Sequence, residues 1–471
     1  MTDLKIVDAH GDERIVPNAE VEHFTGKFNG EVLRPADPGY DDARTVWNGM
    51  IDKYPGLIAR CTGTDDVVAC VNFARDNELL VSVRGGGHNY AGKAVCDGGL
   101  MIDLSPMKDT RVDSEKRTVR AQAGLRLGEL DRETQKFGLA TTLGINTDTG
   151  IAGLTLGGGG GWLSGKFGLA CDNVLSAEVV TAGGQTLTAS PEQNEDLFWG
   201  LRGAGANLGV VTSFEYQLHP VGPVLGGMVI HPLSKAKEVL PFFHEFSSTA
   251  PDEVGTVGLL MTTPDGSPAM GMVACYSGPP DEGEKVLKPL RTFSSPIADM
   301  IAEQSYVEMQ SMFDEIWPPG RLYYHKASNL RDLNDSAIET LVACAQHFPT
   351  AVSSIYLMQY MHGAAIRVGE SETAFPHRYY HYICGVQSGT DDPDDSEKII
   401  RWTRDSWDAI QPFYERAVSL NAVEDTVEEG EHRVREAYGV NYDRLVALKS
   451  KYDPTNMFRL NVNIIPSGVE A

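Results

Sequence analysis

The sequence contains no long hydrophobic run. Nowhere in its 471 residues does an uninterrupted apolar stretch reach membrane-spanning length, and charged residues appear from the third position onward. A membrane helix needs about 20 apolar residues, and a secretory signal needs an apolar core of about 7 to 15. We therefore expect a soluble, cytoplasmic protein with no signal peptide and no membrane partner.

Cysteine is scarce and irregularly placed. The seven cysteines form no C-x-x-C pair, and their number is odd, whereas zinc sites and disulfide frameworks use regularly spaced or paired cysteines. Their positions are Cys61, Cys70, Cys96, Cys171, Cys275, Cys344 and Cys384. We interpret them as buried thiols and expect no metal site.

Basic residues are few compared with acidic ones. Lysine and arginine total 40 against 65 aspartate and glutamate, which gives a net charge of −25. A nucleic-acid surface needs clustered Lys and Arg to neutralise phosphates. Nucleic acid is therefore excluded as an expected partner.

The chain is long enough for two domains, and its pattern changes near His219-Pro220. Before that point, helices and strands alternate with glycine-rich loops in an α+β unit. From about 223 to 415, strands such as Ser-Ser-Ile-Tyr-Leu-Met-Gln-Tyr-Met-His-Gly interleave with helical stretches, which predicts one sheet with helices on one face. The last residues predict a helix, an Asp-Pro turn and an extended tail.

Two glycine-rich segments carry the strongest local signal. Arg84-Gly85-Gly86-Gly87-His88 follows the apolar strand Leu-Leu-Val-Ser-Val, and eight glycines lie between Gly144 and Gly161. Such a loop presents backbone N–H groups suited to a pyrophosphate, here with an imidazole beside them. Neither segment fits the Rossmann or the Walker sequence. The glycines therefore predict a dinucleotide site of another design.

The combination of motifs resembles the vanillyl-alcohol-oxidase superfamily, in particular its berberine-bridge-enzyme-like branch. Four blocks match that family in order and span nearly the whole chain. They are Arg84 to Tyr90 (Arg-Gly-Gly-Gly-His-Asn-Tyr), Gly150 to Gly159, Gly168 to Asn173, and Tyr452 to Ile464.

The resemblance implies a two-domain α+β fold of the PCMH type that binds FAD. Residues 1–222 would form the FAD-binding domain, with a core at about 53–222. Residues 223–415 would form a substrate domain built on an antiparallel sheet covered by helices. Residues 416–471 would form a berberine-bridge-like segment that returns to the FAD domain.

The resemblance also assigns residues to the cofactor. His88 occupies the position of the histidine that is bonded covalently to the 8α-methyl group of the flavin. The other implied cofactor residues are Arg84, Gly85, Gly86, Gly87, Asn89, Tyr90, Thr149, Gly150, Gly153, Leu154, Val211, Asn461 and Asn463.

Many relatives hold the flavin a second time, through a cysteine in a C-P-T-x-G sequence. The aligned residues here are Asn146-Thr147-Asp148-Thr149-Gly150, so that cysteine is missing. Cys171 lies in a block that is otherwise structural, and we interpret it as a packed thiol. A single covalent bond, through His88, is expected.

Thr149 occupies the position that in relatives controls access of oxygen to the flavin. A valine-sized side chain there accompanies oxidase behaviour, and a leucine accompanies blocked access. Threonine is close to valine in size, which favours an oxidase that produces hydrogen peroxide.

The resemblance implies that the sheet of the second domain lies over the flavin, so candidates for the catalytic base are sought on its strands. In the strand 353–363, a period of two places Tyr356, Met358, Tyr360 and His362 on one face. The segment 375–387 would bring further polar residues to a neighbouring strand: Tyr380, Tyr382 and Gln387. The catalytic candidates are therefore Tyr356, Tyr360, His362 and Tyr382. The tyrosines have the alternative of being packing residues, and His362, beside Gly363, has that of facing solvent at a strand end.

The function expected from these features is that of an FAD-dependent oxidase. It would transfer a hydride from a C–OH or C–N carbon of a small or medium organic molecule, such as a sugar, alcohol, alkaloid or secondary metabolite, to the flavin, with molecular oxygen as the second substrate. Two alternatives remain: a dehydrogenase of the same fold with another electron acceptor, and a flavin-binding protein without turnover. The oligomeric state stays open.

Overall fold

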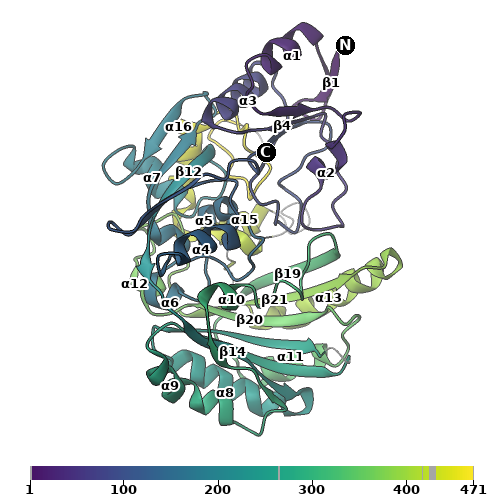
Figure 1. Cartoon of the computed structure of the whole chain (residues 1–471). Helices are drawn as coiled ribbons and strands as arrows, with labels where there is room; N and C mark the ends of the chain where they lie inside the picture. The colour runs from purple at the N-terminus through teal and green to yellow at the C-terminus, as the bar shows by residue number, and fades with distance from the viewer. Residues whose placement is uncertain (1–2, 264–265, 416, 419, 424–430, 470–471) are drawn as a thin grey trace.

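A computed structural model describes residues 3–263, 266–415, 417–418, 420–423 and 431–469. The molecule has two halves stacked on each other, an α+β half that contains the N-terminus and a second half built on an antiparallel sheet (Figure 1). The predicted α+β fold class is confirmed. No helix in these described ranges is both long and apolar enough to cross a bilayer.

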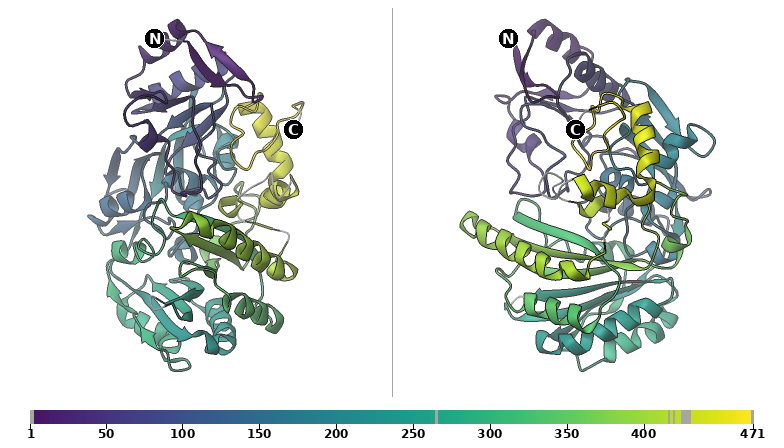
Figure 2. Two further views of the ribbon diagram at one scale, coloured as in Figure 1. Left: turned by 90° about the vertical axis from the view of Figure 1, so that its right-hand side faces the viewer. Right: turned by 180° about the vertical axis from the view of Figure 1, so that it is seen from behind.

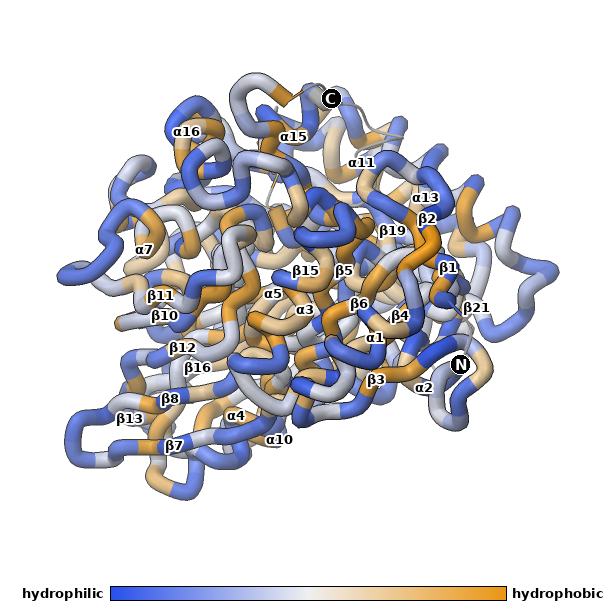
Figure 3. Tube along the Cα trace, turned by 90° about the horizontal axis from the view of Figure 1, so that it is seen from above, coloured by the Kyte–Doolittle hydropathy of each residue, from blue (hydrophilic) through white to orange (hydrophobic). Residues whose placement is uncertain are grey.

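A mixed sheet near the N-terminus positions the first glycine segment. Its strands, in spatial order, are β3 (Glu31–Leu33), β4 (Leu57–Arg60), β6 (Leu100–Asp103) and β5 (Val81–Arg84). The last three pair in parallel and are rich in β-branched and aliphatic residues, as buried parallel strands are. Seen from above, the apolar colouring gathers at β5 and β6, while the outer loops are mostly hydrophilic (Figure 3).

Helix α3 (Thr64–Asp76) connects β4 to β5. Its first turn holds Asp65 and Asp66, and the carboxylate of Asp66 accepts hydrogen bonds from the backbone N–H and the hydroxyl of Thr62. Acidic residues at a helix N-terminus are stabilised by the exposed N–H groups and the helix dipole. Val67, Val71 and Ala74 of this helix are buried.

An antiparallel sheet completes the first half. Its strands, in spatial order, are β11 (Thr186–Ala189), β10 (Val174–Val180), β12 (Val210–Gln217), β8 (Thr118–Gln122) and β7 (Thr110–Asp113). The helices around it are α4 (Leu127–Gln135), α5 (Ile151–Leu156), α6 (Ser164–Phe167) and α7 (Glu195–Leu201). Smaller elements at the edges are β1 (Leu4–Val7), β2 (Glu13–Val16), α1 (Asn18–Thr25), α2 (Tyr40–Arg44), β9 (Leu139–Ala140) and β13 (His219–Pro220).

The second half is a long antiparallel sheet. Its strands, in spatial order, are β17 (Ala298–Asp299), β14 (Val224–Pro232), β16 (Pro268–Tyr276), β15 (Val254–Thr262), β20 (Ser354–Met361), β21 (His381–Thr390) and β19 (Leu322–Leu330), and β18 (Ala302–Gln304) also pairs with β14. Neighbouring strands pair antiparallel, as predicted.

Helices cover the face of this sheet that points away from the first half (Figure 1). They are α8 (Ala236–Thr249), α9 (Pro280–Thr292), α11 (Asp335–Ala345) and α13 (Ser396–Ile410). In α13 the buried residues are Ile399, Thr403, Ser406 and Ile410, whose spacing places them on one face of the helix. The short helices α10 (Tyr306–Gln310) and α12 (Ala364–Arg367) contact elements of the first half.

The C-terminal segment packs on the first half (Figure 2). It contains α15 (Glu431–Tyr438) and α16 (Tyr442–Tyr452), followed by an extended tail. The buried Lys449 pairs with Asp453 at 2.7 Å and donates to the backbone carbonyl of Asn207. The side chain of Asn207 in turn bonds the backbone of Val462 and Ile464. Asn207 therefore anchors the tail to the first half.

Candidate functional site

A cavity of about 370 Å³ lies between the glycine segments of the first half and the sheet of the second. This volume is within the range of roughly 300 to 1,000 Å³ typical of ligand pockets. Its walls therefore bring together residues that are far apart in the sequence.

The backbone of the first glycine segment contacts that of the second. A Cβ atom at Gly86 would lie 2.3 Å from the backbone nitrogen of Gly150, and Gly87 has a φ of +68°. Only glycine is tolerated at such a close approach and favoured at such a positive φ. Bare backbone therefore forms this wall of the cavity.

His88 follows the glycines and lines the cavity. Its Nε2 atom lies 3.0 Å from Oδ1 of Asp148. Its ring stacks on Trp47 at 4.3 Å, and Trp47 stacks on Tyr323 of β19, also at 4.3 Å. The imidazole is therefore held by Asp148 and Trp47 of the first half, and Trp47 is supported by Tyr323 of the second.

Most residues assigned to the cofactor line this cavity. They are Gly85, Gly86, Gly87, His88, Asn89, Tyr90, Thr149, Gly150, Gly153, Leu154 and Asn461.

Arg84, Val211 and Asn463 are not among the residues that line this cavity, and their assignment to the cofactor stays a prediction. The guanidinium of Arg84 makes a bidentate pair with Asp103 at the end of the neighbouring strand. Val211 is buried in β12 within the hydrophobic core of the first half. Asn463 follows the cavity-lining Val462, and its Oδ1 atom, like that of Asn461, is buried without a hydrogen-bond partner among the described residues.

On the opposite half, Tyr356, Met358 and Tyr360 of β20 line the cavity, as the period of two predicted. The hydroxyl of Tyr360 donates to the sulfur of Met358 at 3.2 Å, and burial raises the pKa of Tyr360. Burial therefore favours the neutral phenol of Tyr360, and its assignment as a catalytic residue stays a prediction.

His362 does not share this face, contrary to the prediction. Strand β20 ends at Met361 after a register irregularity that starts at Met358. The ring of His362 packs against Gly165 of the first half, and burial lowers its pKa. The neutral ring is a packing group outside the cavity lining.

Tyr382 also points away from the cavity, which corrects its assignment as a catalytic candidate. Its hydroxyl bonds His244 and Ser247 of α8, at 2.9 and 2.6 Å, and the hydroxyl of Tyr380 donates to it at 2.8 Å. Burial raises the pKa of Tyr382. Gln387 of the same strand, on the opposite face, does line the cavity.

Sequence reasoning missed His325 of β19. It lines the cavity, and its Nε2 atom lies 2.5 Å from the hydroxyl of Tyr356. Tyr90 stacks on His325 at 4.6 Å and donates to Oε1 of Gln387 at 3.0 Å. The alternation of residues along Leu322–Leu330 could have indicated that His325 faces the cavity. Its contact with Tyr356, however, depends on the order of the strands in the sheet, which the sequence does not give.

Two protein families match parts of this chain. Residues 55–190 match the FAD binding domain family, and residues 418–465 match the berberine and berberine-like family. An FAD-linked oxidoreductase of Dictyostelium discoideum is 32% identical over 95% of this chain and 97% of its own length. The chain belongs to the berberine-like FAD-linked oxidoreductases.

Another relative of this oxidoreductase is named for its substrate and activity. The (R)-6-hydroxynicotine oxidase of Paenarthrobacter nicotinovorans is 31% identical over 94% of this chain and 98% of its own length. The solved 6-hydroxy-D-nicotine oxidase of Arthrobacter nicotinovorans superposes with a TM-score of 0.85 at 30% identity, and covers 93% of this chain and 98% of its own. A chitooligosaccharide oxidase shares the fold, with a TM-score of 0.84 at 23% identity over 96% and 100% of the two chains.

The cavity of this oxidoreductase fits its FAD cofactor. Asn146 Oδ1, Gln387 Nε2 and Asn461 Oδ1 are buried without a hydrogen-bond partner among the described residues, and all three side chains line the cavity. Buried polar atoms without partners are costly unless a ligand satisfies them. Together with the bare glycine wall, they suit the polar edge and the pyrophosphate of a dinucleotide.

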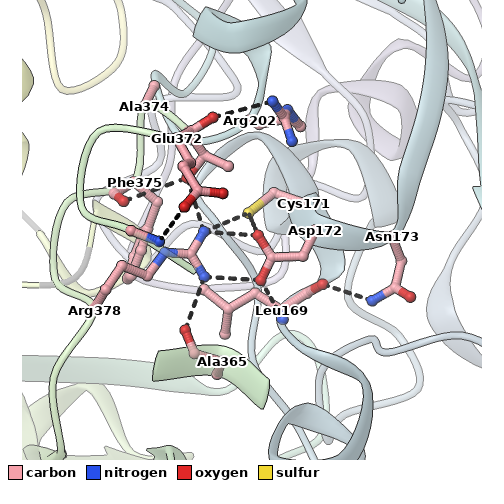
Figure 4. Close-up of polar contacts among 12 residues, drawn as sticks. Leu169, Cys171, Asp172, Asn173, Arg202, Ala365, Glu372, Ala374, Phe375 and Arg378 are labelled. Carbon is pink, nitrogen blue, oxygen red and sulfur yellow. Dashed lines mark hydrogen bonds and ion pairs between the residues drawn. The ribbon is translucent and has the colours of Figure 1, made fainter. Parts of the chain in front are cut away.

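Cys171 lies outside this cavity, in a buried contact between the two halves (Figure 4). Arg378 makes a bidentate pair with Asp172 at 2.7 and 2.8 Å, and its Nη2 lies 3.8 Å from Sγ of Cys171. Burial raises the pKa of the Cys171 thiol. A thiol of this kind is a poor nucleophile.

Proposed function

We propose that this enzyme is an oxidase. In this proposal it takes a hydride from a C–OH or C–N carbon of a small or medium organic molecule, holds FAD covalently through His88, and returns the electrons to dioxygen as hydrogen peroxide. The observation that carries the proposal is that His88 and the paired Tyr356 and His325 line the same cavity.

Bound FAD supplies the hydride acceptor, at its N5 atom. The protein must then orient the substrate and remove the proton of its O–H or N–H group. Tyr356 is the residue for this step, because its hydroxyl is in hydrogen-bond contact with an imidazole that can accept its proton. Tyr360, with its raised pKa, lines the pocket without acting as the base.

Thr149 supports dioxygen as the electron acceptor. It lines the cavity on the second glycine segment, next to Gly150. Its side chain is close to valine in volume, which leaves room for a diatomic gas beside the flavin. The relative that is a hydroxynicotine oxidase supports this choice.

Aromatic and aliphatic side chains form one side of the cavity, and in this proposal they determine which class of substrate binds. Trp317, Tyr356, Tyr360 and Ile383 all line the cavity. Flat aromatic walls favour a substrate with a ring or an extended apolar body that carries an oxidisable hydroxyl or amine.

The testing experiment is anaerobic reduction followed by reoxidation. The purified enzyme is mixed without oxygen with a panel of sugars, aromatic and aliphatic alcohols and amines, and bleaching of the visible flavin absorbance is recorded. Air is then admitted, and hydrogen peroxide is measured.

The proposal expects one class to bleach the flavin and one peroxide to appear per reduced flavin. Reoxidation by an artificial acceptor but not by air would indicate a dehydrogenase of the same fold. A flavin that no compound bleaches would indicate a binding protein without turnover.

A further inference from the structure

Asp148 is the hydrogen-bond partner of the cofactor histidine. Its Oδ1 atom lies 3.0 Å from Nε2 of His88, and the exposed fractions of the two side chains are 22% and 14%. Both groups are therefore shielded from bulk water but not fully buried. The stacking of Trp47 on the imidazole prevents the ring from tilting away from this partner.

The loop that carries Asp148 is fixed from two sides. The backbone N–H and the hydroxyl of Thr147 both donate to the carboxylate of Asp314, at 3.1 and 2.5 Å. The carbonyls of Thr147 and Thr149 accept from the first two residues of α4, Gly128 and Leu127, at 2.9 Å each. The position of Asp148 is therefore set by the fold.

This contact determines which nitrogen of His88 carries the hydrogen. An ionised carboxylate only accepts hydrogen bonds, so Nε2 must be the donor. A neutral imidazole has one N–H, which leaves the lone pair on Nδ1. Within the part of the chain that the structure describes, Nδ1 makes no hydrogen bond.

We propose that Asp148 is a positioning residue that makes Nδ1 of His88 the atom by which the enzyme attaches its own flavin. This inference rests on the proposed covalent bond at His88. In the attachment, a bond forms between Nδ1 and the 8α carbon, the 8α carbon loses one proton, and Nε2 loses its hydrogen as a second proton. The released electron pair and the two protons pass to dioxygen, which gives hydrogen peroxide and leaves oxidised flavin.

The negative charge of Asp148 assists this step in a specific way. When Nδ1 becomes alkylated, the imidazole gains positive charge while Nε2 still carries its hydrogen. A carboxylate at 3.0 Å stabilises that charge and accepts the hydrogen bond. In metal sites, a carboxylate that accepts from the second ring nitrogen likewise holds a metal-binding histidine in one tautomer.

The test compares three variants of the full-length enzyme: Asp148→Ala, Asp148→Asn and Asp314→Asn. Each is expressed with riboflavin and then incubated in air with added FAD. Total flavin is measured on the native protein, and covalent flavin is measured in the washed acid precipitate over time. Asp314→Asn is the matched control, because it removes a carboxylate from the same loop anchor, while its amide oxygen can still accept from Thr147 and the bonds from α4 still hold Asp148 beside His88.

We expect both Asp148 variants to bind FAD but to attach it covalently at least about tenfold more slowly than the parent enzyme, because each loses a hydrogen bond to a charged group. Asp314→Asn should attach it at close to the parent rate. NMR of the flavin peptide from the parent should show the bond at Nδ1.

The proposal is overturned if Asp148→Ala and Asp148→Asn attach flavin at the parent rate, if the bond is found at Nε2, or if Asp314→Asn slows attachment as much as Asp148→Ala does. Failure of the proposed function is distinguished by His88→Ala. If that variant retains covalent flavin, the attachment site itself is wrong, whatever Asp148 does.

Discussion

The hydroxyl of Tyr356 lies 2.5 Å from Nε2 of His325, and both side chains line the cavity between the two halves. The two rings are nearly parallel, with their planes 9° apart. Tyr356 comes from β20 and His325 from β19, which are separated in the sheet by β21. Tyr382 also bonds a histidine, His244, but neither of those two residues lines the cavity, whereas Tyr356 and His325 both do.

Replacing Tyr356 by phenylalanine should slow reduction of the flavin by substrate about 100- to 10,000-fold, the usual cost of a lost general base. The ring is kept and only the hydroxyl is removed, so packing is preserved. Anaerobic stopped-flow absorbance measures this rate directly.

Tyr382→Phe is the matched control, because its hydroxyl bonds α8 on the opposite face of the sheet. It should reduce its flavin at close to the parent rate. If Tyr356→Phe stays within about threefold of the parent, far below the range for a lost base, the hydroxyl of Tyr356 is a packing group and the assignment is wrong.

Replacing Thr149 by leucine should slow the reaction of the reduced flavin with oxygen and leave its reduction by substrate much less affected. The added bulk would occupy the space through which oxygen reaches the flavin, while the substrate approaches along the sheet of the second half. The two half-reactions are measured separately by stopped flow, with Thr149→Val as the size-matched control. Equal losses in both half-reactions would contradict this role.

The stability of the contact between the two halves should depend on pH through Asp131. This residue of α4 is buried, Gln310 of α10 donates to it at 2.9 Å, and burial raises its pKa to about 7. The folded state therefore keeps the proton that the unfolded chain releases above its ordinary pKa of 3.8. The contribution of Asp131 to the free energy of unfolding is therefore fully present below pH 3.8 and is lost as the pH rises through about 7.

Asp131→Asn should remove this loss of stability at high pH. The amide has the same shape as the carboxyl group and accepts the same hydrogen bond from Gln310, but it does not ionise. Its Tm should exceed that of the parent at pH 8, and the difference should shrink steadily toward pH 4. Glu133→Gln, on the exposed face of the same helix, makes the same change in formal charge and should show no such trend. A Tm difference between Asp131→Asn and the parent that is constant over this range would refute the assignment.

Local sequence signals predicted the features that depend on neighbouring residues. Gly86 and Gly150 are required by a close backbone approach, Gly87 is favoured by its positive φ, and the sequence marks these glycines directly. The period of two along β20 brought Tyr356 and Tyr360 to one wall of the cavity.

Features that depend on strand pairing could not be predicted in the same way. His362 left the common face because β20 ends at Met361, and Gly363 indicated a strand end there only as an alternative. Alternation places Tyr382 and Gln387, five residues apart in one strand, on opposite faces, but which of these faces lines the cavity follows only from the fold. His325 and Asp148 acquire partners only when β19 and the second glycine segment reach their places in the fold.

The attachment of FAD to His88 is the central claim, and peptide mapping of the flavin tests it most directly. The purified enzyme is precipitated with acid, digested, and its flavin-containing peptides are identified by mass. The account predicts a yellow precipitate, FAD mass on the peptide that contains residues 84–90, none on the peptide that contains Cys171, and a colourless precipitate from His88→Ala. Flavin that stays bound in His88→Ala, or that maps to another peptide, would contradict it.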